Sequence, residues 1–443
     1  MELTLDAIRK NSLSSLDLRG KAQGDSLVQL VGALRFNSSL SSLDLGSNSL
    51  FNSGTETIAS VLASNSTLTS LSLKSNRIRD RGAEAIATAL ATNSTLTSLD
   101  LKGNEIDVDV MLGTAALATA LRTNSTLTLL NLEGNSLTEV SAVHLATALT
   151  TNSTLSLLCL NYNPQIADRG AAAIAAALTT NSTLSTLLLL NNRITSTGAE
   201  SLAAALTTNN SLTSLDLGNN AITDVGAAHL AAALRTNSVL SLLRLYCTDL
   251  EDAGVAHLAS GLTANSSLTS LDLGNNEITD VGAVSLASAL ASNGTLATLK
   301  LHDNKLLTDA GAKHIAAALK DNGALTSIMM GTLQGPSVLE IRGLTERNLY
   351  NIEAKASLQS LCSRALVRDV FERCDREIKC RVYVQIWIAF GKPEGDPQFG
   401  EHNVFRLWSK FAKAVKAAGI DLGDRTIGAL PAAWDPLVDE CEW

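Results

Sequence analysis

The stretch NSTLTSLDL, from Asn93 to Leu101, decides the fold because the chain repeats it with little change. It returns as NSTLTSLSL at 65–73, as NNSLTSLDL at 209–217 and as NSSLTSLDL at 265–273. A phrase that recurs this closely at regular spacing is typical of a repeat protein, in which each unit packs only against its neighbours.

The repeat period is close to 28 residues. The pattern LxxLxLxxN begins twelve times, and most intervals between starts are 28 residues, with one of 27, two of 29 and one of 31. A fixed period in this range predicts an α/β solenoid over residues 1–335. The starts are Leu13, Leu40, Leu68, Leu96, Leu127, Leu155, Leu184, Leu212, Leu240, Leu268, Leu296 and Leu325.

The unit 212–239 shows what each position does. LTSLDL alternates apolar and polar residues, which predicts a short strand with one buried face, and Asn220 follows at a turn, where its amide would bond backbone groups of neighbouring coils. We expect Asp224 to cap the helix that begins there and Asn237 to end it in the left-handed conformation. The helical spacing of one face is seen in Ile222, Gly226, Leu230, Ala233 and Leu234.

The asparagine that opens the phrase also creates an N-x-S/T glycosylation pattern. No basic and apolar leader precedes the repeats, so we interpret these asparagines as structural. The pattern occurs at Asn37, Asn65, Asn93, Asn124, Asn152, Asn181, Asn209, Asn265 and Asn293.

Charge and composition exclude several classes of function. The 443 residues carry a formal net charge of −9, which disfavours a nucleic-acid partner, and no stretch is apolar enough to span a membrane. The six cysteines have no disulfide or zinc-site spacing. We therefore expect a cytoplasmic protein that binds neither nucleic acid nor membrane.

The unit LxxLxLxxNxI…GAxxLAxALxxN resembles the ribonuclease-inhibitor type of leucine-rich repeat across residues 13–335. It is also similar to the repeat regions of NOD-like receptors and to Ran GTPase-activating proteins. The resemblance implies a horseshoe with a parallel β-sheet inside and helices outside. It further implies that proteins bind on the concave face.

Function is expected where the repeat pattern fails on the concave face. In three central repeats the residue between the second and third leucine becomes Cys159, Leu188 and Arg244, and the ninth repeat replaces the turn asparagine with Thr248. Apolar, aromatic and arginine side chains dominate protein-binding hot spots. The predicted partner-binding residues are Asn161, Tyr162, Leu188, Leu190, Arg244, Tyr246 and Cys247.

Most repeats carry an acidic residue between the second and third leucine. This column predicts a partner that is basic on its contacting face, although such columns are often simply solvated. Its members are Asp17, Asp44, Asp100, Asp216 and Asp272.

No catalytic or metal-binding motif stands out. His144, His229, His257 and His314 share one helix-surface column, but helices of neighbouring repeats lie about 8–10 Å apart, too far for one zinc ion. The sequence has no phosphate-binding glycine loop, GxSxG elbow or HExxH. We therefore predict a non-enzyme without metal or cofactor.

The composition changes after Gly335, where all four tryptophans lie. Within 336–443 we predict helices over 344–374 and 403–419 and a strand over Arg381–Phe390. Two interpretations stay open for this region: a cap on the open end of the solenoid, or a separate adaptor module.

These observations favour a protein–protein interaction scaffold. The resemblance leaves two alternatives, a regulator that activates a small GTPase and a receptor-like sensor that signals through its C-terminal region.

Overall fold

A computed structural model describes residues 2–22, 24–109 and 112–362, and it confirms the solenoid. In this part of the chain a single sheet holds twelve parallel strands in sequence order, and each strand pairs with the strand of the next repeat. The strands are β1 (Ser15–Asp17), β2 (Ser42–Asp44), β3 (Ser70–Ser72), β4 (Ser98–Asp100), β5 (Leu129–Asn131), β6 (Leu157–Cys159), β7 (Thr186–Leu188), β8 (Ser214–Asp216), β9 (Leu242–Arg244), β10 (Ser270–Asp272), β11 (Thr298–Lys300) and β12 (Ser327–Met329).

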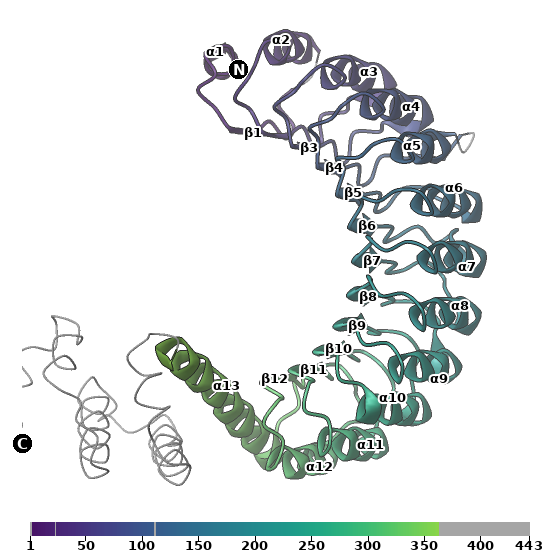
Figure 1. Cartoon of the computed structure of the whole chain (residues 1–443), viewed down its shortest axis with the longest axis vertical. Coiled ribbons are helices and arrows are strands. Elements are labelled where there is room, and N and C mark those ends of the chain that lie inside the picture. Colours follow the sequence, from purple (N-terminus) through teal and green to yellow (C-terminus); the bar gives the residue numbers. More distant parts are fainter. Residues whose placement is uncertain (1, 23, 110–111, 363–443) are drawn as a thin grey trace, which may run out of the picture. The chain divides into compact units, whose positions relative to one another are not determined.

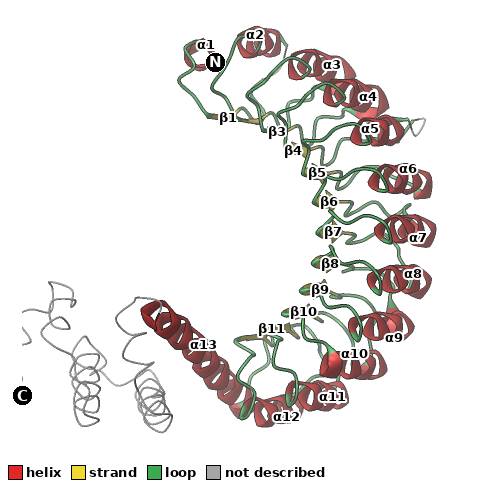
Figure 2. Cartoon of the chain, in the orientation of Figure 1, coloured by secondary structure: helices red, strands yellow, loops and turns green. Residues whose placement is uncertain are grey.

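A helix crosses back from each strand to the next. Figure 1 shows the helices on the outer side of the solenoid and the strands on its inner side. Figure 2 shows the loops that join them. The helices are α1 (Glu2–Arg9), α2 (Asp25–Leu34), α3 (Phe51–Leu62), α4 (Arg79–Leu90), α5 (Gly113–Leu121), α6 (Glu139–Leu149), α7 (Ala167–Leu178), α8 (Ser196–Leu206), α9 (Thr223–Leu234), α10 (Asp252–Ala264), α11 (Asp280–Leu290), α12 (Asp309–Leu319) and α13 (Pro336–Cys362).

The chain forms two compact units, Met1–Arg342 and Gly343–Trp443, and the sequence boundary between them falls within α13. In the first unit, Ile341 of α13 is buried and Ser337 donates through its N–H and hydroxyl to Asp309 at 3.0 Å. The start of α13 thus covers the last repeat. The strand and second helix predicted beyond residue 374 lie outside the described residues.

The core is a stack of leucine layers. In the unit 212–239, Leu212, Leu215 and Leu217 are fully buried, and α9 buries the face predicted for it, including Leu230 and Leu234. Each buried leucine side chain contributes roughly 1.5–3 kcal/mol to folding. A single repeat cannot bury this face alone, so stability arises from stacking.

The turn asparagines form a continuous ladder. The Asn76 amide donates to Leu73 O in its own coil and to Leu45 O in the preceding coil, both at 2.8 Å, while its oxygen accepts from Asn48 N–H at 2.7 Å. The ladder therefore satisfies buried backbone groups that the short strands leave open. Its members are Asn48, Asn76, Asn104, Asn135, Asn163, Asn192, Asn220, Asn276 and Asn304.

A second asparagine column corrects the expectation for Asn237. This residue is buried and does not adopt a left-handed backbone; its amide donates to Leu206 O at 2.8 Å and to Asn209 O at 3.2 Å. Equivalent amides in other repeats, such as that of Asn93, bond the preceding coil in the same way. Most of the N-x-S/T asparagines are therefore buried hydrogen-bond donors, in keeping with their structural interpretation.

The helix-start aspartates also act between repeats. Asp224 does not cap its own helix α9, whose N-cap is Ile222; it accepts from Glu251 N–H of the next repeat at 2.9 Å. Asp252 shows the full pattern, accepting from Thr279 N–H at 2.9 Å, from the Thr279 hydroxyl at 2.5 Å and from Gly282 N–H at 2.8 Å. The first-turn carboxylate of one helix thus caps the next helix.

In the part of the chain that the structure describes, no helix is both long and apolar enough to cross a membrane.

We predict that Thr248→Asn raises the free energy of unfolding by about 1 kcal/mol. The Thr248 hydroxyl donates to Leu245 O at 2.6 Å and has no second hydrogen for Leu217 O in the preceding coil, whereas an asparagine amide has two. Urea unfolding followed by circular dichroism would measure the change. The reverse substitution, Asn192→Thr, should lower stability by about 2 kcal/mol. A Thr248→Asn protein no more stable than wild type would contradict the ladder's role.

We predict that Asp280→Ala destabilises the protein by about 1 kcal/mol at pH 7 and by less as the pH falls. Burial raises the pKa of Asp280, but hydrogen bonds from Thr308 N–H, the Thr308 hydroxyl and Gly311 N–H outweigh it and leave the pKa lowered. A group with a lowered folded pKa stabilises above its unfolded pKa of about 3.9, and the contribution is lost as pH falls through the folded value. Urea unfolding at pH 7, 4 and 3 tests this, and a difference that stays constant with pH would contradict it.

Candidate functional site

The concave face is lined by two columns of strand side chains. The first runs through the opening residue of each strand, from Ser15 to Ser327, and the second through the closing residue, from Asp17 to Met329. The middle residue of each strand points into the core, as Leu215 does in β8. Parallel register places equivalent residues of adjacent repeats about 4.8 Å apart, so a partner would meet a continuous surface.

The aspartates of the acidic column accept hydrogen bonds from the backbone. Each of its aspartates accepts a hydrogen bond from the N–H two residues further on, as Asp44 does from Gly46 at 2.8 Å and Asp216 from Gly218 at 3.0 Å. Such side-chain turns hold the end of a strand. Burial raises the pKa of Asp216, an effect that the hydrogen bond from Gly218 and the charge of Arg244 oppose.

Cations from neighbouring repeats lie against these carboxylates. Arg244 Nη1 lies 3.3 Å from Asp216 Oδ2, and Lys300 Nζ lies 3.1 Å from Asp272 Oδ2. Near the N-terminus, Asp44 lies within 4 Å of both Arg19 and Lys74. The acidic column would attract a basic partner only through free carboxylates, and four of its five aspartates, all but Asp100, lie in ion pairs within the protein.

The central repeats present an apolar surface, here called the central patch. Of the predicted residues, Leu188, Leu190, Arg244, Tyr246 and Cys247 are half-buried, and the Tyr162 side chain is 46% exposed. Tyr162 and Cys247 occupy the turn just past the strand, with φ of 56° and 53°. The central patch comprises Leu129, Leu157, Tyr162, Leu188, Leu190, Leu242, Arg244, Tyr246 and Cys247.

Asn161 is not part of this contact surface. Its side chain is 9% exposed and its oxygen accepts from Leu190 N–H at 2.8 Å. It therefore positions the strand end beside Leu190.

Three patch leucines were missed from the sequence. Leu129, Leu157 and Leu242 replace the usual serine or threonine in the first concave column and are half-buried. The signal was available, since LTSLDL becomes LTLLNL, LSLLCL and LSLLRL in these repeats. LSLLCL and LSLLRL depart from the pattern in both columns, and the prediction used only the second.

The Tyr246 ring packs against Gly218 of the preceding repeat. A Cβ at Gly218 would collide with the Tyr246 ring, so this glycine leaves the space that the ring occupies. Burial, followed by the charge of Asp216 and the proximity of Tyr162, raises the pKa of Tyr246 to about 12. The tyrosine stays neutral at physiological pH, as a hot-spot side chain with an apolar face and a polar tip.

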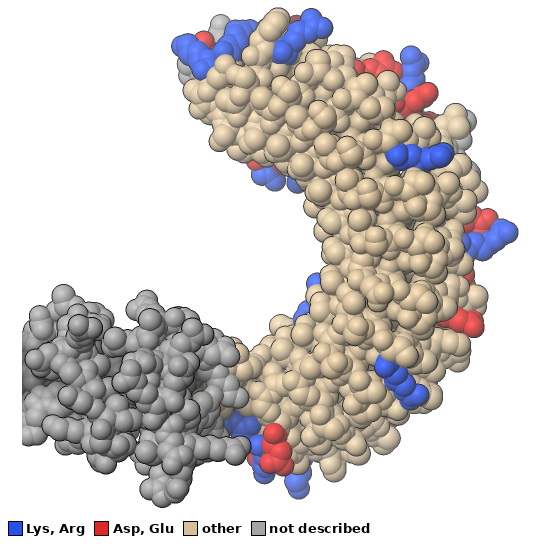
Figure 3. Space-filling model, in the orientation of Figure 1, with Lys and Arg blue, Asp and Glu red and all other residues tan. Residues whose placement is uncertain are grey.

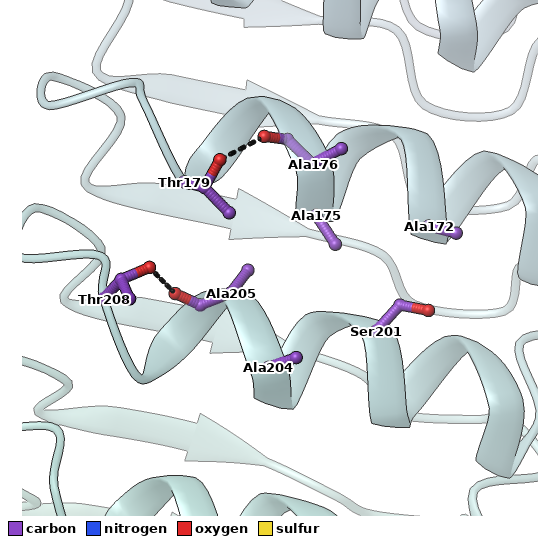
Figure 4. Close-up of a pocket in the computed structure, with 8 residues that line it drawn as sticks. All are labelled: Ala172, Ala175, Ala176, Thr179, Ser201, Ala204, Ala205 and Thr208. Atoms are coloured by element: carbon purple, nitrogen blue, oxygen red, sulfur yellow. Dashed lines mark hydrogen bonds between the residues drawn. The ribbon is translucent and has the colours of Figure 1, made fainter.

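The helix side of the described repeats carries a groove of small residues. A shallow groove of about 480 Å³ lies between α7 and α8 and is lined by small residues such as Ala172, Ala176 and Ser201 (Figure 4). Among the described residues, no group of three or more histidines, cysteines or carboxylates could hold a metal ion. The four column histidines lie on helix surfaces; His229 and His257 lie on the adjacent helices α9 and α10, and at least one helix separates His144 and His314 from them.

A family model described as "Leucine Rich repeat" matches residues 64–87, 92–109, 180–203, 208–231 and 264–287. No curated protein matches the chain.

Several solved structures are similar to this chain. An internalin from Listeria monocytogenes has 21% identity and a TM-score of 0.43, covering 76% of this chain and 86% of its own. A chain of the yeast Rad7–Elc1 complex has 19% identity and a TM-score of 0.40, covering 75% and 83%. Leiomodin-1 actin-binding site 2 has 25% identity and a TM-score of 0.35, covering 37% and 95%.

We predict that Cys159 resists alkylation in the folded protein at pH 8. Its side chain is 4% exposed, and burial raises the pKa of its thiol to about 11, so about 0.1% is thiolate. Raising the pH to 10 should accelerate its labelling by iodoacetamide about 100-fold, because the thiolate fraction rises tenfold per pH unit. Mass spectrometry of tryptic peptides would report each cysteine, with urea-unfolded protein as the reference. Equal rates for Cys159 in folded and unfolded protein would contradict its burial.

Proposed function

Because the chain is a leucine-rich-repeat protein, we propose that it is an interaction scaffold whose concave face binds a protein partner through the central patch. The single observation that carries the proposal is the break in the pattern at repeats five, six, seven and nine. There leucine replaces serine or threonine in the first concave column, cysteine, leucine and arginine replace aspartate in the second, and Tyr246 stands where neighbouring repeats have glycine.

The geometry supports this assignment over a purely structural role. Leu129 and Leu157 are register neighbours, and Leu188 pairs with Cys159 of the adjacent strand, so apolar side chains lie next to one another over β5 to β7. Ser214 and Asp216 of β8 separate them from Leu242 and Arg244 of β9. Contiguous exposed apolar surface marks interaction sites in soluble proteins. Tyr162 and Tyr246 add aromatic area, and Arg244 adds hydrogen-bond donors beside it.

The other predictions of function gain no support from the described residues. Activation of a small GTPase and receptor-like signalling rest on family resemblance alone. The ribonuclease-inhibitor subtype, the cytoplasmic location and the role of 336–443 as cap or adaptor stay predictions.

We predict that Arg244→Ala/Tyr246→Ala abolishes capture of a partner from native cell extract. Removing an arginine and a tyrosine from a hot spot costs about 2 kcal/mol or more each, so retention should fall at least tenfold. Quantitative mass spectrometry of proteins retained on immobilised full-length chain would measure it.

The matched control is Arg169→Ala/Val281→Ala, which removes an exposed cation and an exposed apolar side chain from α7 and α11. Thermal unfolding must show that both double variants stay folded. Retention of the same proteins by wild type and the Arg244/Tyr246 variant would overturn the concave site, whereas loss in the control as well would place binding elsewhere.

A further inference from the structure

We propose that the segment bound by the concave face is acidic: a protein segment with an apolar centre for the central patch and glutamate or aspartate side chains on either side of it. This inference rests on the proposed function and specifies the chemistry of the partner.

Among the described residues, the cation is more exposed than the acid in each ion pair that joins two repeats across the concave face. The Arg244 side chain is 36% exposed against 8% for Asp216, and Lys300 is 31% exposed against 7% for Asp272. Lys102 is likewise 48% exposed against 18% for Glu133. An approaching partner therefore meets guanidinium and ammonium groups, with the carboxylates beneath them.

At the N-terminal end of the sheet the same order holds for Asp44, but not for Asp17, which is 53% exposed beside Arg19. Arg19 and Lys74 are 55% and 34% exposed, and the Asp44 that they share is 25% exposed. Figure 3 shows blue cationic groups at two places on the inner edge of the solenoid.

These cations keep donors for a ligand. Arg244 makes one side-chain hydrogen bond, from Nη1 to Asp216, and Lys300 makes one, to Asp272, within the part of the chain that the structure describes. A guanidinium has five N–H donors and an ammonium three. Carboxylates accept such bonds in a charge-assisted and, with arginine, bidentate geometry.

The apolar centre lies between two groups of cations. One group is Arg19, Lys74 and Lys102, and the other is Arg244 and Lys300. Strands β6 and β7 carry no charged residue, and β7 presents Leu188 to the concave face. Arg244 lies two strands beyond Leu188, or about 10 Å, which an extended peptide spans in about three residues. The matching segment thus places an acidic residue about three positions from its apolar anchor.

A protein segment fits better than another polyanion. The whole chain carries a net charge of −9, which repels nucleic acid at long range. A few local cations beside an apolar surface suit a short acidic sequence with an apolar anchor.

The test compares two labelled peptides that share a Leu-Phe-Leu core, one flanked by glutamates and the other by lysines. Fluorescence anisotropy with the full-length protein should give at least tenfold tighter binding of the glutamate peptide, weakened by salt. Arg244→Gln/Lys300→Gln should reduce its affinity about tenfold. The matched control Arg122→Gln/Arg169→Gln removes the same charge from the helix side and should change affinity less than twofold.

Preference for the lysine peptide, lost in Tyr246→Ala, would overturn the acidic partner while leaving concave binding intact. Binding of neither peptide at concentrations up to about 1 mM would also overturn it, and the capture experiment would still decide the proposed function on its own. A single-stranded oligonucleotide that bound as tightly as the glutamate peptide would overturn a protein segment as the occupant.

Discussion

The asparagine ladder is the interaction on which the rest of the structure depends. Strands of three residues leave most turn carbonyls and N–H groups without strand partners, and burying them unpaired costs about 1–3 kcal/mol each. Each ladder amide bonds its own coil and the preceding one, as Asn76 does with Leu73 and Leu45. The polar backbone is therefore satisfied only when coils are stacked, and the same stacking buries the leucine layers.

Two further sets of side chains also form hydrogen bonds between neighbouring coils. Asn237 and its equivalents bond the preceding coil where helix meets strand, and Asp252 and Asp280 cap the helix that follows them. All three devices lie in the interior or at the loops. Concave side chains also link neighbouring coils, as Thr97 does with Thr69 O and Arg244 with Asp216, but these links lie outside the three interior and loop sets. The concave positions can therefore vary at repeats five, six, seven and nine while the frame stays constant.

The leucine spacing predicted the twelve strands, their parallel order and the helix faces, because each of these follows from a local period. It did not predict where Asp224 and Asn237 make their hydrogen bonds, because their acceptors and donors lie about one repeat away along the chain. The candidate site was predicted in part for the same reason. Tyr246 and Leu188 stood out as breaks in a column, while the burial of Asn161 followed from a bond to Leu190 that no local pattern contains.

The charge of the concave face shows how stacking changes the meaning of a sequence column. Aspartate recurs at the end of the strands because its carboxylate accepts the N–H two residues on, and this holds it close to the backbone. The longer Arg244 and Lys300 side chains come from the next repeat and extend over it. Where Arg244 and Lys300 follow Asp216 and Asp272, the cation therefore lies outermost, because side-chain length and register, rather than composition, decide the order. Asp17, which is 53% exposed, shows that the order does not extend to the first repeat.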